Sequence, residues 1–512
     1  MDLRKLRKQK PPRKLRLVEA LYYSETGLKK EQLLKIAKCS LPSLLDDIKS
    51  LNASDLPFTI CKDKSLYFLK FDPSATIDSV YSNILNTSLE YQLIGYLFFQ
   101  SHYNIEKLSD QLHCSFATVQ RYLKLIKKVF PHWNIQVNHR PNRLEGDEVM
   151  LRHFYYLYFK ERRFPLQDYG FSETLVAAAD RYIRAFLLEN DVSNSMHTHF
   201  HLMHSFLICL HRKKKTYDLN EPIPYDHYFR LPEKSEHSDL VNQLTLECRL
   251  SYTPELIMEA LWPVFSDNLV LTPAQQSHQR LTNYKLAAFY DLHTQLMKSI
   301  NLALDNTLTE QEIQEGLRQL GNDAMIYFPD AEPITILAQP KKQTLKILER
   351  SYAPALNRLV TIIRTFFDLH HLPYSEEQIE LYLSSLILSI DGLLQRMTKA
   401  EQSIKVLLIS DTSASQERFW RSMLTSLVHA PLECSFFSFP YITQKDLNRT
   451  TEDFDLIITD ITMPELDSAC TVIAVNSYPT SQDIAAIQHF FDDFAARPLD
   501  RKEIEHEPAL SS

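Results

Sequence analysis

The sequence predicts a mainly α-helical, multidomain chain that ends in a small α/β domain. Apolar residues recur at helical spacing through most of the chain as far as about Arg396. Buried strands that alternate with helices appear only after residue 400, beginning with IKVLLIS at Ile404–Ser410. With 512 residues the chain is too long for one hydrophobic core, because domains hold ~100–200 residues each.

The first part of the chain contains a weaker copy of a pattern that recurs further along. Helices are expected at Lys14–Ser24 and at Leu28–Lys38, and Ser40 can cap a third helix that runs through Asn52. Residues 58–69 then read as a hairpin that turns at Lys62-Asp63-Lys64, which would form a wing. The third helix carries Asp46 and Asp47. Because these carboxylates would repel phosphate, we expect the second unit to make the main base contacts.

The second and clearer helix-turn-helix pattern is NIEKLSDQLHCSFATVQRYLKLIKKVF, residues 104–130. Asn104 can cap a short helix, His113 fits a tight connection, and Ser115 can cap the next helix. A capping box formed by Thr87 and Glu90 predicts a preceding helix over about residues 88–101. One face of the helix after Ser115 would be buried through Val119, Leu123 and Ile126.

A wing is expected directly after this unit. Ile135 and Val137 alternate with polar residues, NHRPNR turns, and Leu144 resumes the strand. A short helix, a turn and an amphipathic helix form the geometry that enters a major groove, although two ordinary packed helices would give a similar pattern. The candidates for base or groove contacts are Ser115, Thr118, Gln120 and Arg121, and those for phosphate contacts are Lys124, Lys127, Lys128, Arg140 and Arg143.

Composition favours DNA contact at the front of the chain and argues against an enzyme. Residues 1–150 hold 23 Lys+Arg against 16 Asp+Glu, whereas the remainder holds 33 against 48. Only seven glycines occur, where average usage would give about 36. The nearest approach to a phosphate-binding loop, Gly316-LRQL-Gly321, lacks the lysine that its chemistry needs. We therefore expect no catalytic residues and no cofactor.

Two further properties bear on compartment and metal content. No apolar run approaches the ~18–20 residues of a transmembrane helix, so we expect a cytoplasmic chain with no membrane partner. The seven cysteines are scattered without any C-x-x-C, which argues against disulfides and zinc. His197 and His201 stand four residues apart, but no carboxylate or cysteine lies at ligand spacing nearby. We therefore expect no metal site.

The middle of the chain, from Ser172 to about Arg396, is expected to form two helical bundles. A boundary is expected near residues 278–285, where one bundle ends and the next begins. The last domain is expected to be a small parallel sheet with a helix over Ala414–His429 and another over Ser481–Phe494. Its strands are expected at Ile404–Ser410, Ser435–Phe439, Asp455–Thr459 and Thr471–Val475.

This order of domains resembles the Mga family, which comprises virulence regulators of Gram-positive bacteria and includes AtxA-like proteins. The most specific segments are HLMHSFLICLHRKKK, residues 201–215, and SFATVQRYLKLIKK in the second helix-turn-helix. The resemblance implies a DNA-binding transcriptional regulator that activates its target genes. It divides the chain into two winged helix-turn-helix units (1–72 and 73–165), two bundles like phosphotransferase-system regulation domains (166–285 and 286–400), and an EIIB-like domain (401–512).

The resemblance also implies that histidines accept phosphate from the carrier proteins of the sugar phosphotransferase system. A neutral imidazole is a nucleophile near neutral pH, and the added charge can change the packing between modules. For each histidine, a purely structural role in the core is the competing interpretation. The candidates are His204, His371, His201, His278, His293 and His370, with His204 ranked first and His371 second.

The last domain departs from a working phosphocarrier, which carries a cysteine directly after the first strand. This chain has Asp411-Thr412-Ser413 there, so we expect the domain to have lost phosphoryl transfer and to serve homodimerisation. The same departure argues against one alternative, a catalytic phosphotransferase component. A second alternative, an RNA-binding antiterminator, would open with a small β-rich domain, whereas this chain opens with helices.

Overall fold

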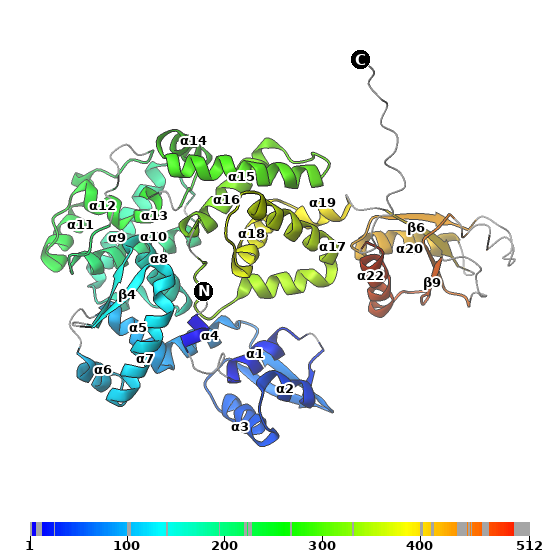
Figure 1. Cartoon of the computed structure of the whole chain (residues 1–512), viewed down its shortest axis with the longest axis horizontal. Coiled ribbons are helices and arrows are strands. Elements are labelled where there is room, and N and C mark those ends of the chain that lie inside the picture. The colour runs from blue at the N-terminus through cyan, green and yellow to red at the C-terminus, as the bar shows by residue number, and fades with distance from the viewer. Residues whose placement is uncertain are drawn as a thin grey trace, which may run out of the picture. The chain divides into compact units, whose positions relative to one another are not determined.

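The computed structural model is mainly helical (Figure 1). Its residues divide into two compact units. The first unit comprises residues 1–292, 317–343 and 372–381, and the second comprises residues 293–316, 344–371 and 382–512. The structure describes residues 3–6, 13–24, 26–99, 104–139, 142–193, 195–219, 223, 228–266, 269–329, 332–399, 403–410, 414–437, 448, 451, 453–462 and 470–495.

The chain begins with three helices and a small antiparallel sheet, in the order that the sequence predicted. The helices are α1 (Arg13–Tyr22), α2 (Lys30–Ala37) and α3 (Leu41–Asn52). The sheet has the order β1-β3-β2, and its strands are β1 (Leu28–Lys29), β2 (Phe58–Asp63) and β3 (Leu66–Phe71). Alternating burial along β2 places Phe58 and Ile60 in the core beside the apolar side of the helices.

The second group of elements contains the clearer helix-turn-helix pattern. Its elements are α4 (Asp78–Thr87), α5 (Leu89–Phe99), α6 (Ile105–Gln111), α7 (Phe116–Val129), β4 (Ile135–His139), β5 (Asn142–Gly146) and α8 (Glu148–Glu161). β4 and β5 pair as the antiparallel hairpin that the alternation predicted. The predicted capping box was wrong. Thr87 ends α4, and its hydroxyl donates to the carbonyl of Asn83 one turn back instead of capping α5.

The middle of the chain is helical. Its α-helices are α9 (Glu173–Glu189), α10 (Met196–Lys213), α11 (Ser238–Gln243), α12 (Pro254–Ala260), α13 (Trp262–Phe265), α14 (Pro273–Thr282), α15 (Tyr284–Ala303), α16 (Glu310–Ala324), α17 (Pro340–Leu369), α18 (Glu376–Ser389) and α19 (Leu393–Lys399). Non-helical torsion angles at Tyr352, two residues before Pro354, kink α17. Short 3₁₀ turns occupy Leu3–Leu6, Phe130–Trp133, Leu166–Tyr169, Lys234–His237 and Met325–Tyr327, and a π-helical turn occupies Leu244–Cys248.

The second unit includes a four-stranded parallel sheet with the order β7-β6-β8-β9. Its elements are β6 (Ile404–Ile409), α20 (Ala414–Leu427), β7 (Leu432–Phe436), β8 (Leu456–Thr459), β9 (Thr471–Ala474) and α22 (Ser481–Ala495). One face of the sheet packs against both helices, with Trp420 of α20 and Phe491 of α22 in the shared core.

One strand of this sheet lies away from its predicted position. β7 begins and ends three residues before the predicted Ser435–Phe439. It is the edge strand next to β6, and its side chains are at most half-buried, so its hydrophobic signal is weak. The loop that would distinguish a phosphocarrier, Asp411-Thr412-Ser413, lies outside the described residues.

Candidate nucleic-acid interface

The turn between α6 and α7 is built as the sequence predicted. The Asn104 side chain accepts a 2.9 Å hydrogen bond from the Lys107 amide and caps α6. Ser115 accepts a 3.2 Å hydrogen bond from the Thr118 amide and caps α7. Between the two caps, His113 takes a left-handed conformation with φ of 47°. These local contacts fix where α7 begins and therefore which of its side chains face outward.

α7 has one apolar face and one cationic face. Val119, Leu123 and Ile126 are at most 2% exposed and hold the helix against its neighbours. Gln120, Arg121, Lys124 and Lys128 are exposed, whereas Thr118 and Lys127 are half-buried. The guanidinium of Arg121 lies 5.1 Å from the centre of the Tyr122 ring. Three cations spaced by one turn each, Arg121, Lys124 and Lys128, thus form a stripe along the outer face of α7.

Other predicted contact residues are already engaged within the chain. The hydroxyls of Ser115 and Thr118 lie 2.9 Å apart and hydrogen bond to each other. Arg143 of β5 forms an ion pair with Glu145 on its own strand, which competes with a phosphate for its guanidinium. Arg140 lies outside the described residues. The exposed stripe on α7 is therefore better placed for an anion than the described part of the hairpin.

Phe116 is a candidate contact that the sequence prediction missed. It is the first residue of α7 and is 47% exposed. Large apolar side chains at the start of a recognition helix can contact the methyl group of thymine. The signal was available in the sequence, because Phe116 follows the capping Ser115 and lies off the face that Val119 and Leu123 define.

In the first group of helices, the expectation that both Asp46 and Asp47 repel phosphate is wrong for Asp47. Only Asp46 is exposed, since Asp47 is buried. The guanidinium of Arg13 binds both carboxylate oxygens of Asp47, with one nitrogen–oxygen distance of 2.9 Å. Asp47 therefore fastens α3 to α1 and does not project toward a phosphate backbone, which removes half of the predicted repulsion. The hydrogen bond to Asp47 also raises the pKa of the Arg13 guanidinium.

A buried ion-pair network joins α8, the helix after the hairpin, to α10. Glu148 of α8 accepts hydrogen bonds from Arg152 on the same helix at 2.9 Å and from Arg212 of α10 at 2.9 and 2.6 Å. The three side chains are at most 4% exposed. The guanidinium of Arg212 also lies 3.8 Å from the centre of the Tyr217 ring.

The network continues to α12. Glu259 accepts a 2.9 Å hydrogen bond from Arg152 and a 2.6 Å hydrogen bond from Lys213. Lys213 also pairs with Asp218, so three carboxylates balance two guanidinium groups and one ammonium. We conclude that α8, which belongs with the helix-turn-helix elements in sequence, is locked to the helices that follow it.

Comparison with known proteins supports a regulator. Residues 73–159, which run from just before α4 to near the end of α8, match the family described as Mga helix-turn-helix domain. The chain is 21% identical over 496 residues to the "Capsule synthesis positive regulator AcpB" of Bacillus anthracis, covering 94% of this chain and 98% of that protein. The segment that contains α6, α7 and the β4–β5 hairpin therefore matches an Mga helix-turn-helix domain. A "Putative trans-acting regulator" of Streptococcus pneumoniae serotype 4 is 23% identical over 168 residues, or 32% of this chain and 34% of that protein.

These names indicate a regulator and not an enzyme. They assign to the Mga family the segment in which α6, α7 and the hairpin lie, so the exposed stripe of α7 belongs to the family's helix-turn-helix domain. Within the described ranges, no helix is both long and apolar enough to cross a membrane. No group of three or more His, Cys, Asp or Glu in those ranges is placed to hold a metal ion.

The histidines that the Mga-family resemblance singled out differ in accessibility. His204 is 6% exposed, and its Nδ1 lies 2.8 Å from the Tyr169 hydroxyl, to which it is hydrogen bonded. Burial lowers the pKa of His204 to about 4, so its ring is neutral at pH 7. His293 is fully buried and is hydrogen bonded to the Tyr382 hydroxyl at 2.8 Å. Among the remaining candidates, His201, His278 and His370 are half-buried, and His371 is exposed.

Proposed function

We propose that this chain is a transcriptional regulator that binds promoter DNA with α7 in the major groove. The observation that carries the proposal is the exposed cationic stripe of Arg121, Lys124 and Lys128 on a helix whose start is fixed by Ser115. A helix capped and oriented in this way can present its first turns to base edges while its later turns follow the backbone.

The position of each side chain along α7 suggests a division of roles. Gln120 and Arg121 lie in the first two turns, where side chains reach base edges, and Phe116 supplies an apolar contact for thymine. Lys124 and Lys128 lie further along and suit phosphate contacts, with the half-buried Lys127 beside them. With so few base readers, sequence-dependent bending of the DNA would supply part of the specificity.

The name of the relative that spans the chain suggests the direction of regulation. That protein is named a positive regulator of capsule synthesis, so we infer that this chain activates genes for surface or virulence factors. Binding of promoter DNA by the full chain, measured by mobility shift at several salt concentrations, tests the proposal. We expect the affinity to fall steeply as salt increases, because Lys and Arg contacts release counterions. Binding that is absent at low salt, with folded protein, would contradict it.

We also propose that the regulator is linked to carbon supply through phosphohistidine. His371 is exposed and stands directly after α17 with φ of 52°, so a carrier protein can reach its ring. His204 is buried beside Tyr169 and would have to become accessible before it could accept a phosphoryl group. Among the six candidate histidines, His371 therefore suits direct transfer best.

Incubation with the general phosphotransferase carrier proteins and phosphoenolpyruvate should place phosphate on His371, as mapped by mass spectrometry under neutral conditions. His371→Gln should remove that modification, whereas His489→Gln, which changes an exposed histidine of α22, should leave it in place. Phosphate on neither His371 nor His204 would refute both assignments.

Finally, we propose that the domain from residue 403 onward mediates homodimerisation. Burial raises the pKa of the Cys434 thiol and of the Cys470 thiol to about 11, so neither is a ready nucleophile at pH 7. A domain without phosphoryl chemistry is free to serve as a contact surface, and symmetric DNA half-sites favour dimers. Light scattering should give twice the chain mass for the full protein and a monomer after removal of residues 403–512. A truncated protein that remains dimeric would refute this role.

A further inference from the structure

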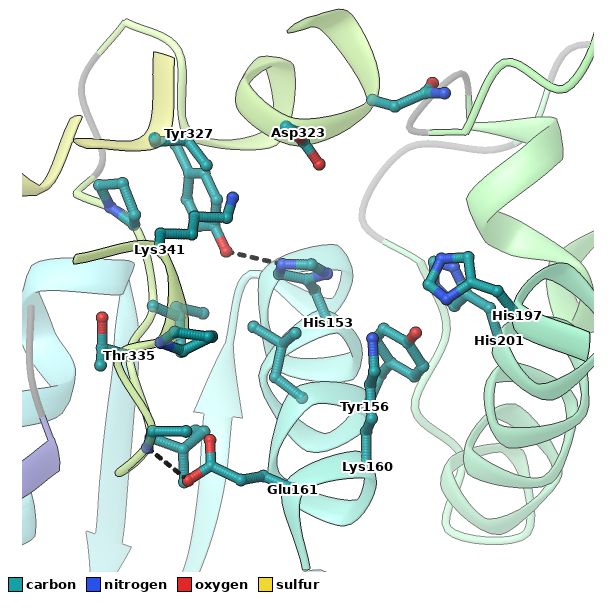
Figure 2. Close-up of a pocket in the computed structure, with 18 of the residues that line it drawn as sticks. His153, Tyr156, Lys160, Glu161, His197, His201, Asp323, Tyr327, Thr335 and Lys341 are labelled. Atoms are coloured by element: carbon teal, nitrogen blue, oxygen red, sulfur yellow. Dashed lines mark hydrogen bonds between the residues drawn. The ribbon is translucent and has the colours of Figure 1, made fainter. Parts of the chain in front are cut away.

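A cavity of about 690 Å³ lies within the first unit (Figure 2). Side chains from α8, from α10 and from residues 318–342 converge on it, as Figure 2 shows for Lys160, His201 and Lys341. Its volume falls within the ~300–1,000 Å³ that is typical of small-molecule sites. Apolar and aromatic groups line part of the wall, among them Tyr156, Leu157, Tyr327, Ile334, Ile336 and Leu381.

Two lysines project into this space without a carboxylate partner. Within the described residues, neither Lys160 nor Lys341 forms an ion pair, and the ammonium of Lys160 lies 5.6 Å from the centre of the Tyr156 ring. Lys160 is exposed and Lys341 is half-buried, yet the surrounding protein lowers the pKa of both ammonium groups through desolvation. An anion between them would replace the solvation that they have lost.

Several of the acidic side chains in the wall are already engaged. The wall contains five basic and five acidic side chains. Asp78 pairs with Arg163 at 3.7 Å, and Glu380 pairs with Lys342 at 3.3 Å. The carboxylate of Glu161 accepts hydrogen bonds of 2.8 and 2.7 Å from the amides of residues 337 and 338, and desolvation raises its pKa to about 7.

The charges that remain leave the centre of the cavity positive. Three cationic side chains remain, those of Lys160, Arg318 and Lys341, and two carboxylates, those of Asp323 and Glu377. Arg318 is directed to the carbonyls of residues 270 and 271, at 3.4 and 3.3 Å. The two lysines are therefore the cations available to a ligand, and Asp323 is available to accept a hydrogen bond from a hydroxyl group.

Histidines add neutral hydrogen-bonding groups. The Nε2 of His201 is buried and has no hydrogen-bond partner in the described part of the chain, and its ring stacks on Tyr156 with 3.9 Å between the centroids. The Nε2 of His153 is hydrogen bonded to the Tyr327 hydroxyl at 2.7 Å. A buried nitrogen without a partner is costly, so a ligand atom beside His201 would satisfy it.

We propose that this cavity binds a small phosphorylated organic molecule, with its phosphate between Lys160 and Lys341 and a polar atom beside Nε2 of His201. Two ammonium groups suit a dianionic phosphate, and the cavity is far larger than a phosphate ion alone requires. Bound there, the ligand would touch α8, α10 and the segment around Lys341 together, and so would stabilise their arrangement. Binding of this ligand would not require DNA.

Calorimetric titration of the full chain tests the site directly. We use glucose 6-phosphate and glycerol 3-phosphate as organic probes, inorganic phosphate as the minimal probe, and glucose as the uncharged comparison. We expect at least one organic phosphate to bind at one site per chain more tightly than inorganic phosphate, and inorganic phosphate to compete with it. Glucose should not bind measurably. Lys160→Met/Lys341→Met should weaken binding by at least about tenfold, since hydrogen bonds to charged groups are lost.

Two controls test whether a loss of binding comes from the cavity lysines themselves. Lys298→Met/Lys346→Met removes two exposed lysines outside the cavity and should leave binding unchanged. The cavity variant should keep or raise the melting temperature without ligand, because it removes two poorly solvated charges, so a loss of binding cannot be attributed to unfolding. The proposal is wrong if inorganic phosphate neither binds nor competes, or if the cavity variant binds as wild type does. A covalent phosphoryl group on the chain, seen by intact mass after the titration, would also overturn it.

Discussion

Replacing Glu148 with glutamine is expected to lower the free energy of unfolding of the first unit by about 3–5 kcal/mol. The substitution keeps the shape of the side chain but removes the charge that Arg152 and Arg212 share. It also turns one accepting oxygen into an N–H donor that faces a guanidinium group. Because Arg152 is 0% exposed and Arg212 is 2% exposed, water cannot take the place of the lost carboxylate.

Urea unfolding followed by tryptophan fluorescence measures this effect. Trp133 and Trp262 report on the first unit, while Trp420 reports on the second. The matched control is Glu31→Gln, which removes the same charge from an exposed pair with Lys30 and should leave the transition where it is in wild type. An equally small shift for Glu148→Gln would show that the network contributes little and that packing alone holds α8 to α10.

A triple replacement separates the cost of breaking the network from the value of having it. Exchanging Glu148, Arg152 and Arg212 for methionine removes the three most deeply buried charges together and fills the same space with apolar groups, while Glu259 keeps its ion pair with Lys213. We expect this variant to be less destabilised than Glu148→Gln, since a buried charge left without its partner costs more than a charge that is absent. The network would then act chiefly to fix how α8 meets α10.

Local features of the fold could be predicted from the sequence because their causes lie a few residues apart. Asn104 and Ser115 cap their helices through amides three residues on, and a capping side chain in front of an apolar periodicity signals that arrangement. The same local reading failed at Thr87, where the hydroxyl had a second nearby acceptor in the carbonyl of Asn83. The sequence pattern also misplaced β7. Its side chains at the sheet edge are at most half-buried, so apolar and polar positions do not alternate clearly there.

The contacts that connect distant parts of the chain could not be predicted in this way. Arg212 reaches Glu148 across 64 residues, and Arg152 reaches Glu259 across 107 residues. No spacing rule relates such positions, so their charges looked like ordinary solvated residues in the sequence. Asp47 was misread for the same reason, because its partner Arg13 lies on another helix. The cavity near Lys160 is a further case, since its wall brings Lys160 together with Lys341, 181 residues further along the chain.

Replacing Arg121 and Lys124 together with alanine is expected to weaken binding of promoter DNA by about a hundredfold at physiological salt. Arg121 lies where a base edge is within reach, and a bidentate contact to guanine contributes about 1–3 kcal/mol of discrimination. Lys124 follows one turn later toward the backbone, and loss of one phosphate contact should make the slope of log affinity against log salt shallower by about one. Both side chains are exposed, so the fold should not change.

The informative comparison removes the same charge from the other helix-turn-helix-like group. Lys35→Ala/Lys49→Ala takes two exposed lysines from α2 and α3. If binding depended only on the positive charge of the front of the chain, both double variants would lose similar affinity and keep the same sequence preference. If α7 is the recognition helix, only Arg121→Ala/Lys124→Ala should lose discrimination between promoter and scrambled DNA. Loss of discrimination in the Lys35/Lys49 variant alone would move the recognition helix to α3, where Asp47 and Arg13 already fix the orientation of the helix.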